Sequence, residues 1–104
     1  MNKIEIKGIE LLDEEEKQIA NKLFDGYYPK IERIAKNDLL LKVHIKEYDK
    51  DGKKSKYSIN AEAIFSGKML SSSSWDYDLA RAIHKSMKKL ETEIEHKFHT
   101  SEQH

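Results

Sequence analysis

The sequence predicts an α+β domain with the element order strand, helix, three strands, helix (β-α-β-β-β-α). Apolar residues alternate with period two in four short stretches, and they recur every three to four residues in two longer ones. Adjacent strands with a helix before and after them are typical of two helices packed on one face of a four-stranded, mainly antiparallel sheet. With 104 residues, the chain is expected to form a single α+β domain over residues 1–99, followed by a flexible tail over 100–104.

The N-terminal part of the chain contains the first strand and the start of the first helix. Charged and apolar residues alternate over Lys3–Lys7 and stop at Gly8, which predicts a short strand with one buried face. Asp13 and Glu16 have the three-residue spacing of a capping box, so the first helix is expected to begin there.

The first helix carries an interruption. Gly26 and Pro29 are residues that end or kink helices, and they lie within its apolar pattern. We therefore expect the helix to end or kink here, with a separate helical turn that begins at Pro29, where a missing amide hydrogen does no harm.

The middle of the chain predicts an antiparallel hairpin. Residues 39–46 and 57–65 alternate with period two, and Asp51-Gly52 between them is a pair expected in a tight reversal. One side of the first of these strands is apolar throughout: Leu39, Leu41, Val43 and Ile45. After a turn at residues 66–68, a short fourth strand is expected from Met69 to Ser72.

The last helix follows a run of serines. We interpret Ser71–Ser74 as the polar end of the fourth strand and a helix cap, with Asp76 and Asp78 in the first helical turn. Trp75, just before the helix, is expected to anchor the core. The helix should extend to about residue 98, because apolar residues keep helical spacing to that point: Leu79, Ala82, Ile83, Met87, Leu90, Ile94 and Phe98.

The exposed side of the last helix is basic. Arg81, Lys85 and Lys88 have helical spacings of four and three, and His84 and Lys89 lie beside them with no carboxylate in between. This pattern makes them candidate RNA-binding residues, although a solvated helix face produces the same pattern. The hairpin supplies a second group of candidates, for which lysines that protect an edge strand are the alternative explanation: Lys42, Lys46 and Lys56.

Composition and motifs exclude several classes of function. The 19 basic and 19 acidic side chains balance, which argues against indiscriminate coating of nucleic acid but permits a local basic patch. There is no cysteine and no apolar run long enough to cross a bilayer, so a cytosolic protein without a membrane partner is expected. The glycines form no phosphate loop, and His96 and His99 lack a third ligand. We therefore expect no enzyme, no cofactor, no metal and no small-molecule substrate.

The last predicted helix begins with a specific pattern: Asp, apolar, two variable residues, Ala-Ile, three variable residues, apolar, variable, Lys-Leu-Glu. The residues that fill it without a gap are Asp78, Leu79, Ala82, Ile83, Met87, Lys89, Leu90 and Glu91. In this pattern, and in the strand segment Tyr57–Ala63, the chain resembles the ribosome hibernation-promoting family of ribosome-associated inhibitors. The resemblance covers roughly the C-terminal half. The zero net charge and the Gly26–Pro29 interruption depart from the family pattern.

The resemblance implies a function and a partner. Family members occupy the decoding channel of the small ribosomal subunit and inhibit translation, so the implied partner is that subunit and its ribosomal RNA. The chain resembles the short form of the family, without the additional dimerisation domain, and is expected to act as a monomer. Two alternatives stay open: a double-stranded RNA-binding module, and a protein-interaction or self-assembly module that uses an exposed sheet face or edge.

Overall fold

The computed structural model of the protein describes residues 3–49 and 55–102. The predicted order of strands and helices is confirmed, with one additional short turn of 3-10 helix, η1, after the first strand. The elements are β1 (Ile4–Lys7), η1 (Ile9–Leu11), α1 (Glu14–Ala35), β2 (Leu40–Asp49), β3 (Ser55–Phe65), β4 (Lys68–Asp76) and α2 (Leu79–Glu102).

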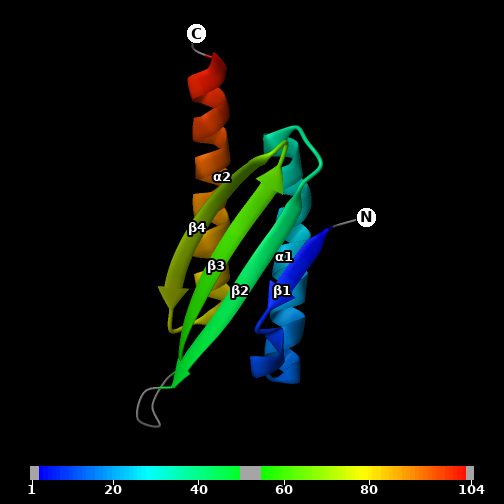
Figure 1. Cartoon of the computed structure of the whole chain (residues 1–104). Helices are drawn as coiled ribbons and strands as arrows, with labels where there is room; N and C mark the ends of the chain where they lie inside the picture. The colour runs from blue at the N-terminus through cyan, green and yellow to red at the C-terminus, as the bar shows by residue number, and fades with distance from the viewer. Residues whose placement is uncertain (1–2, 50–54, 103–104) are drawn as a thin grey trace.

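The four strands form one sheet in the order β1-β2-β3-β4. β1 is parallel to β2, and the two other pairs are antiparallel, so the sheet is mainly antiparallel as predicted. Both helices cover the same face of the sheet and lie side by side, and neither of these described helices covers the opposite face (Figure 1). This second face is called the open face below.

The β2–β3 hairpin has the predicted pairing. Its register runs from Leu40 opposite Ile64 to Asp49 opposite Ser55, and the predicted Asp51-Gly52 turn lies outside the described residues. The side chains predicted to be buried on the first strand are all buried: Leu39, Leu41, Val43 and Ile45. The same holds for alternate residues of β3, so the period-two pattern identified the helix-covered face of the hairpin correctly.

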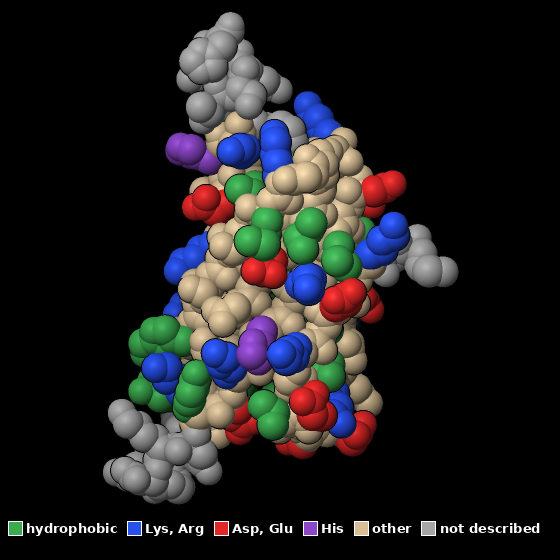
Figure 2. Space-filling view, in the orientation of Figure 1, with side chains coloured by type: hydrophobic (Ala, Val, Ile, Leu, Met, Phe, Trp, Pro, Cys, Tyr) green, Lys and Arg blue, Asp and Glu red, His purple; other side chains and the backbone are tan. Residues whose placement is uncertain are grey.

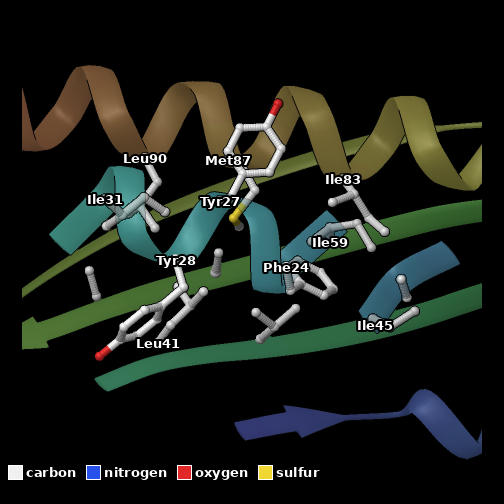
Figure 3. Packing of buried hydrophobic residues seen from close by; sticks show 14 of the residues in the cluster. Phe24, Tyr27, Tyr28, Ile31, Leu41, Ile45, Ile59, Ile83, Met87 and Leu90 are labelled. Atoms are coloured by element: carbon white, nitrogen blue, oxygen red, sulfur yellow. The ribbon is translucent and has the colours of Figure 1, made fainter. Parts of the chain in front are cut away.

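The core lies between the two helices and this face, and two adjacent tyrosines show how it is organised. Tyr28 is directed toward the sheet and Tyr27 toward α2 (Figure 3). The Tyr28 hydroxyl donates to the Leu39 carbonyl oxygen at 2.6 Å, and the Tyr27 hydroxyl lies 2.5 Å from Nδ1 of His84. Each ring is therefore buried while its polar end has a partner, as buried tyrosines require.

Gly8 explains why β1 ends where it does. Its φ is +92°, and a Cβ atom at this position would lie 2.1 Å from the carbonyl oxygen of Ile45. Only glycine combines this left-handed conformation with so close an approach of two backbones. The turn into η1 and α1 can therefore lie tightly against β2.

The start of α1 is as predicted, and its interior is not. The Glu16 backbone N–H donates to Asp13 Oδ1 at 2.8 Å, and the Asp13 N–H donates to Glu16 Oε1 at 3.1 Å, which completes the capping box. The expected end of the helix at Gly26–Pro29 was wrong, because α1 continues through Pro29 to Ala35. Pro29 lies on the exposed side of the helix, so the Asp25 carbonyl that loses its partner faces water. The buried side chains on the opposite side keep the helix against the core.

β4 is longer than predicted. It runs to Asp76 and contains the whole serine run, so the expected helix cap within Ser71–Ser74 was wrong, as was the place of Asp76 in the helix. α2 is capped instead by Asp78, whose Oδ1 accepts from the Arg81 N–H at 2.9 Å. The small serines suit this position, because Ser72 Oγ donates to the carbonyl oxygen of the fully buried Ser86 on α2 at 2.8 Å.

Two further expectations about this region fail. Trp75 is 49% exposed rather than a core anchor, because on the longer strand it alternates with the helix-facing residues Leu70, Ser72 and Ser74. α2 continues to Glu102 rather than ending near Phe98. The division into a domain over 1–99 and a tail over 100–104 stays a prediction.

Candidate nucleic-acid interface

The predicted cations of α2 are exposed along the outer side of that helix. Arg81, Lys85, Lys88 and Lys89 all lie away from the core, as the helical spacing indicated. In the view of the open face, basic side chains also gather along the margin where β4 and α2 lie (Figure 2). The exposed side of α2 that carries Arg81, Lys85, Lys88 and Lys89, together with the edge of β4, is called the α2–β4 surface below.

A carboxylate that the sequence pattern did not reveal lies beside these cations. Asp76, at the end of β4, has its Oδ2 2.9 Å from Lys85 Nζ and its Oδ1 3.7 Å from Arg81 Nη1. The hydrogen bond from Lys85 and that from the Asp78 N–H lower the pKa of Asp76. The sequence has no carboxylate between Arg81 and Lys89. In the folded protein, however, Asp76 on the neighbouring strand lies beside these cations.

Two lysines of α2 also contact the backbone of β4. Lys85 Nζ donates to the Trp75 carbonyl oxygen and Lys89 Nζ to the Ser73 carbonyl oxygen, each at 3.1 Å. β4 is at the edge of the sheet, where carbonyl groups would otherwise be available to another strand. The lysines therefore occupy part of this edge while their side chains stay accessible to solvent.

His84 and Lys88 point toward α1 rather than toward β4. His84 contacts the Tyr27 ring edge-on, with ring centroids 5.5 Å apart, in addition to its hydrogen bond with the Tyr27 hydroxyl. Lys88 Nζ lies 3.8 Å from Glu91 Oε1. Burial, followed by the charge of Glu91, raises the pKa of the Tyr27 hydroxyl. His84 thus has a structural role at the helix–helix contact, whereas the Lys88 side chain is 66% exposed.

The hairpin lysines lie on the open face, in different surroundings. Lys42 is opposite Glu5 on one neighbouring strand and opposite Glu62 on the other, so carboxylates flank its charge. Lys46 is opposite the uncharged Ser58. Register therefore separates two lysines that look equivalent in the sequence, because carboxylates lie opposite Lys42 and an uncharged serine lies opposite Lys46.

A groove connects the open face to α2 across β4. Its lining includes His44 on β2 and Ser73 on β4, and its charged residues are balanced: Lys7, Lys42, Lys88 and Lys89 against Glu5, Glu10, Glu62 and Glu93. Residues from the two predicted basic groups therefore border one surface, although they are more than 40 positions apart in the sequence.

The sequence reasoning missed an exposed aromatic group near this groove. Trp75 and Tyr77 contact each other edge-on with centroids 5.6 Å apart, and Lys56 Nζ lies 4.6 Å from the Trp75 ring centroid. Lys56 also lies 5.8 Å from the centroid of Tyr48. A strand prediction extended to Asp76 would have placed Trp75 on the open face, so the signal was present in the alternation with Leu70.

Within residues 3–49 and 55–102, no three histidine, aspartate or glutamate side chains are placed so that they could hold a metal ion. Among the same described residues, no helix has the length and apolar character needed to cross a membrane.

The fold has a counterpart among solved structures. It is similar to the crystal structure of the N-terminal domain of Protein Y from Thermus thermophilus, with a TM-score of 0.63 over 92% of this chain and 98% of that chain. The two sequences are 21% identical, so the similarity establishes a shared fold. No protein-family model and no curated protein matches the sequence significantly.

Proposed function

We propose that this protein binds ribosomal RNA of the small ribosomal subunit through the α2–β4 surface, occupies the decoding channel and thereby inhibits translation. It would act in the cytoplasm, without catalysis and without a cofactor. The observation that carries the proposal is the row of exposed cations on the outer side of α2, formed by Arg81, Lys85, Lys88 and Lys89. Phosphate groups of folded RNA are contacted by such arrays of cations on a rigid scaffold.

The ion pairs of this surface are compatible with RNA binding. Arg81 and Lys85 share the single carboxylate of Asp76, and the side chains of both cations are exposed. The Asp76 side chain is only 13% exposed, but both cations stay in contact with solvent, so a phosphate can compete with Asp76 for them. Because the chain has no net charge, binding would depend on this local patch and would be sensitive to salt.

Sequence and fold support the ribosome as the partner. The Asp78–Glu91 pattern resembles that of the hibernation-promoting family, and the structure has the element order that the resemblance implies. The fold shared with the N-terminal domain of Protein Y supports the same assignment. Position in the decoding channel and inhibition of translation rest on the resemblance alone.

The alternatives are less well supported. A double-stranded RNA-binding module needs an open, positive N-terminus on its last helix, and here the Asp78 carboxylate occupies that end of α2. An assembly module that adds a strand at β4 would have to displace Lys85 and Lys89 from the Trp75 and Ser73 carbonyl groups.

Co-sedimentation with small ribosomal subunits over a series of salt concentrations tests the proposal. We expect wild type to pellet at low salt and the Lys85→Gln/Lys88→Gln variant to bind more weakly. Removal of one lysine–phosphate interaction should make the plot of log affinity against log salt shallower by about 0.7–0.9, and removal of both by roughly 1.5. Subunits that already carry messenger and transfer RNA should bind less wild-type protein, because the channel is occupied.

The matched control removes two positive charges elsewhere. Lys22 and Arg33 are exposed on α1, so Lys22→Gln/Arg33→Gln changes net charge equally and leaves the α2–β4 surface intact. This variant should pellet like wild type. The proposal fails if wild type stays in the supernatant at low salt, or if the two double variants behave alike.

A further inference from the structure

One end of the open face carries three large aromatic side chains that are about half exposed: Tyr48 (49%), Trp75 (49%) and Tyr77 (53%). Together with Lys56 they are called the aromatic cluster below. We propose that the aromatic cluster binds unpaired nucleobases of single-stranded RNA by stacking. This deepens the proposed function, on which it rests, because it identifies the part of the RNA that the protein would contact beyond phosphate groups.

The exposure of these rings is unusual because the same chain buries other aromatic residues well. Phe24 and Tyr28 are almost completely covered in the core. Trp75 and Tyr77 instead lie next to each other at the end of β4, with ring planes at 89°. Contiguous exposed apolar surface of this kind marks an interaction site more often than an isolated exposed residue does.

Lysines surround the rings, which favours a nucleic acid over an apolar protein surface as the partner. Lys56 Nζ lies over the Trp75 ring at 4.6 Å and Lys85 Nζ at 5.9 Å, and Lys56 also reaches the Tyr48 ring. An ammonium group over a ring is weakly held at an exposed site, by roughly 0.5–1 kcal/mol. A base can therefore replace it on the ring face, and the displaced lysine remains within reach of the adjoining phosphate.

The position of the aromatic cluster, next to the α2–β4 surface, fits the stacking of nucleobases. Trp75 and Lys85 line a hollow that also includes Lys88 and Lys89, so the rings adjoin the α2–β4 surface. In Figure 2, hydrophobic and basic side chains lie together at the lower left of the view. A strand of RNA held by its phosphates along α2 could thus place a base on Trp75. Combinations of stacking platforms and basic grooves are the common means of binding single strands.

Trp75 is the single tryptophan of the chain, so its fluorescence reports directly on the site. We expect an eight-residue oligoadenylate to quench this fluorescence, and an abasic ribose-phosphate strand of the same length to quench it much less. A fully paired RNA duplex of the same length should also quench weakly, because its bases are already stacked. The proposal is overturned if oligoadenylate produces no quenching, or if the abasic strand produces as much.

Variants measured with a fluorescently labelled oligoadenylate locate the contact. Loss of one stacked base is worth about 1–3 kcal/mol, so Trp75→Leu should weaken binding roughly 5- to 150-fold. Lys56→Gln should weaken it less. The controls Met69→Ala and Lys68→Gln change exposed residues at the other end of β4 and should stay within about twofold of wild type. Equal weakening by Met69→Ala and Trp75→Leu would contradict the proposal.

The same measurements separate this inference from the proposed function. Pelleting with ribosomal subunits without quenching by oligoadenylate would overturn the stacking site and leave the ribosome assignment in place. Quenching by oligoadenylate without pelleting would overturn the ribosome assignment and leave the stacking site in place. A second copy of this chain is the competing occupant. If wild type is a dimer in sedimentation velocity and Trp75→Leu is a monomer, the rings serve self-association and the proposal is wrong. Should Trp75→Leu fail to fold, the wild-type quenching with its abasic control decides alone.

Discussion

The same four strands place very different side chains on the two faces of the sheet. Facing the helices, β2 and β3 present only apolar or small side chains along most of their length, and these are fully buried. On the open face, residues opposite one another on neighbouring strands form rows, and the polarity and charge of these rows differ from one end of the sheet to the other. One row is apolar, the next alternates in charge, and the last is aromatic and basic: Leu40-Ile64-Met69, Glu5-Lys42-Glu62-Ser71, and Tyr48-Lys56 beside Trp75.

This difference shows which properties a local pattern can encode. Burial depends on the face of a strand, which alternation along one segment determines. The surroundings of an exposed charge depend on which strands lie beside it and in what register, and that is a long-range property. Lys42 and Lys46 illustrate the point, because they occupy the same face of β2 but Lys42 has charged neighbours and Lys46 an uncharged one.

The largest expected difference between the faces is in stability. Phe24→Ala empties a fully buried site between α1 and the sheet and should lower the free energy of unfolding by about 3–5 kcal/mol. Met69→Ala, at a 59% exposed position on the open face, should change it by less than about 0.5 kcal/mol. Urea unfolding at pH 7 measures both. A cost for Met69→Ala well above this range would mean that the open face is covered in solution.

A smaller effect is expected at the border of the helix-covered face, where Tyr57 on β3 hydrogen-bonds to Glu16 on α1 at 2.5 Å. Burial, then this hydrogen bond, raises the pKa of Tyr57 above the ordinary value of 10. The folded state thus favours the neutral phenol, so the stabilisation is fully present below pH 10 and is lost as pH rises above it. Tyr57→Phe should cost about 1 kcal/mol at pH 7.

Unfolding measured from pH 7 to pH 11 checks the sign of this effect. The difference in unfolding free energy between wild type and Tyr57→Phe should shrink above pH 10. Tyr48→Phe, which removes a hydroxyl on the open face, serves as the comparison and should leave the stability at pH 7 unchanged. A difference for Tyr57→Phe that stays constant up to pH 11 would contradict the assigned hydrogen bond.

The smallest expected effect on stability concerns Asp76. Its pKa is lowered in the folded state, so its stabilising contribution is present above the ordinary pKa of an aspartate and disappears as pH falls through the lower folded value. Asp76→Asn should therefore be less stable than wild type at pH 7, and the two proteins should converge in acid, below the folded pKa. The same variant should bind labelled oligoadenylate more tightly, because Arg81 and Lys85 are released from their carboxylate. Weaker binding would argue against competition between Asp76 and phosphate.

The accuracy of the sequence predictions follows the same division. The order of elements along the chain, the buried side of the hairpin and the α1 cap depend on patterns within single segments, and all three are confirmed. The end of the helix at Pro29 was predicted wrongly, because the destabilisation caused by a proline inside a helix depends on whether the carbonyl group that loses its hydrogen bond faces water. The length of β4 was misread because serines have little strand preference of their own, and pairing with β3 decides the matter.

The candidate site was predictable only in part. The cations of α2 lie on one exposed side because helix periodicity requires it. The contact between Asp76 and Lys85 and the position of Lys56 over Trp75 arise from different elements of the fold, which the periodicity of one segment cannot bring together. Whether the predicted cations bind RNA is a matter for the co-sedimentation experiment.

The lysines along β4 have a further consequence, which concerns solubility. A protein with equal numbers of acidic and basic side chains has little overall repulsion between molecules near neutral pH, where its isoelectric point also lies. Protection against precipitation must then come from local features. Lys85 and Lys89, lying across the edge of β4, hinder the strand-to-strand contact from which aggregates grow. The variant Lys85→Ala/Lys89→Ala would uncover this edge while changing net charge by only two, and the shelf life of a concentrated solution should shorten accordingly.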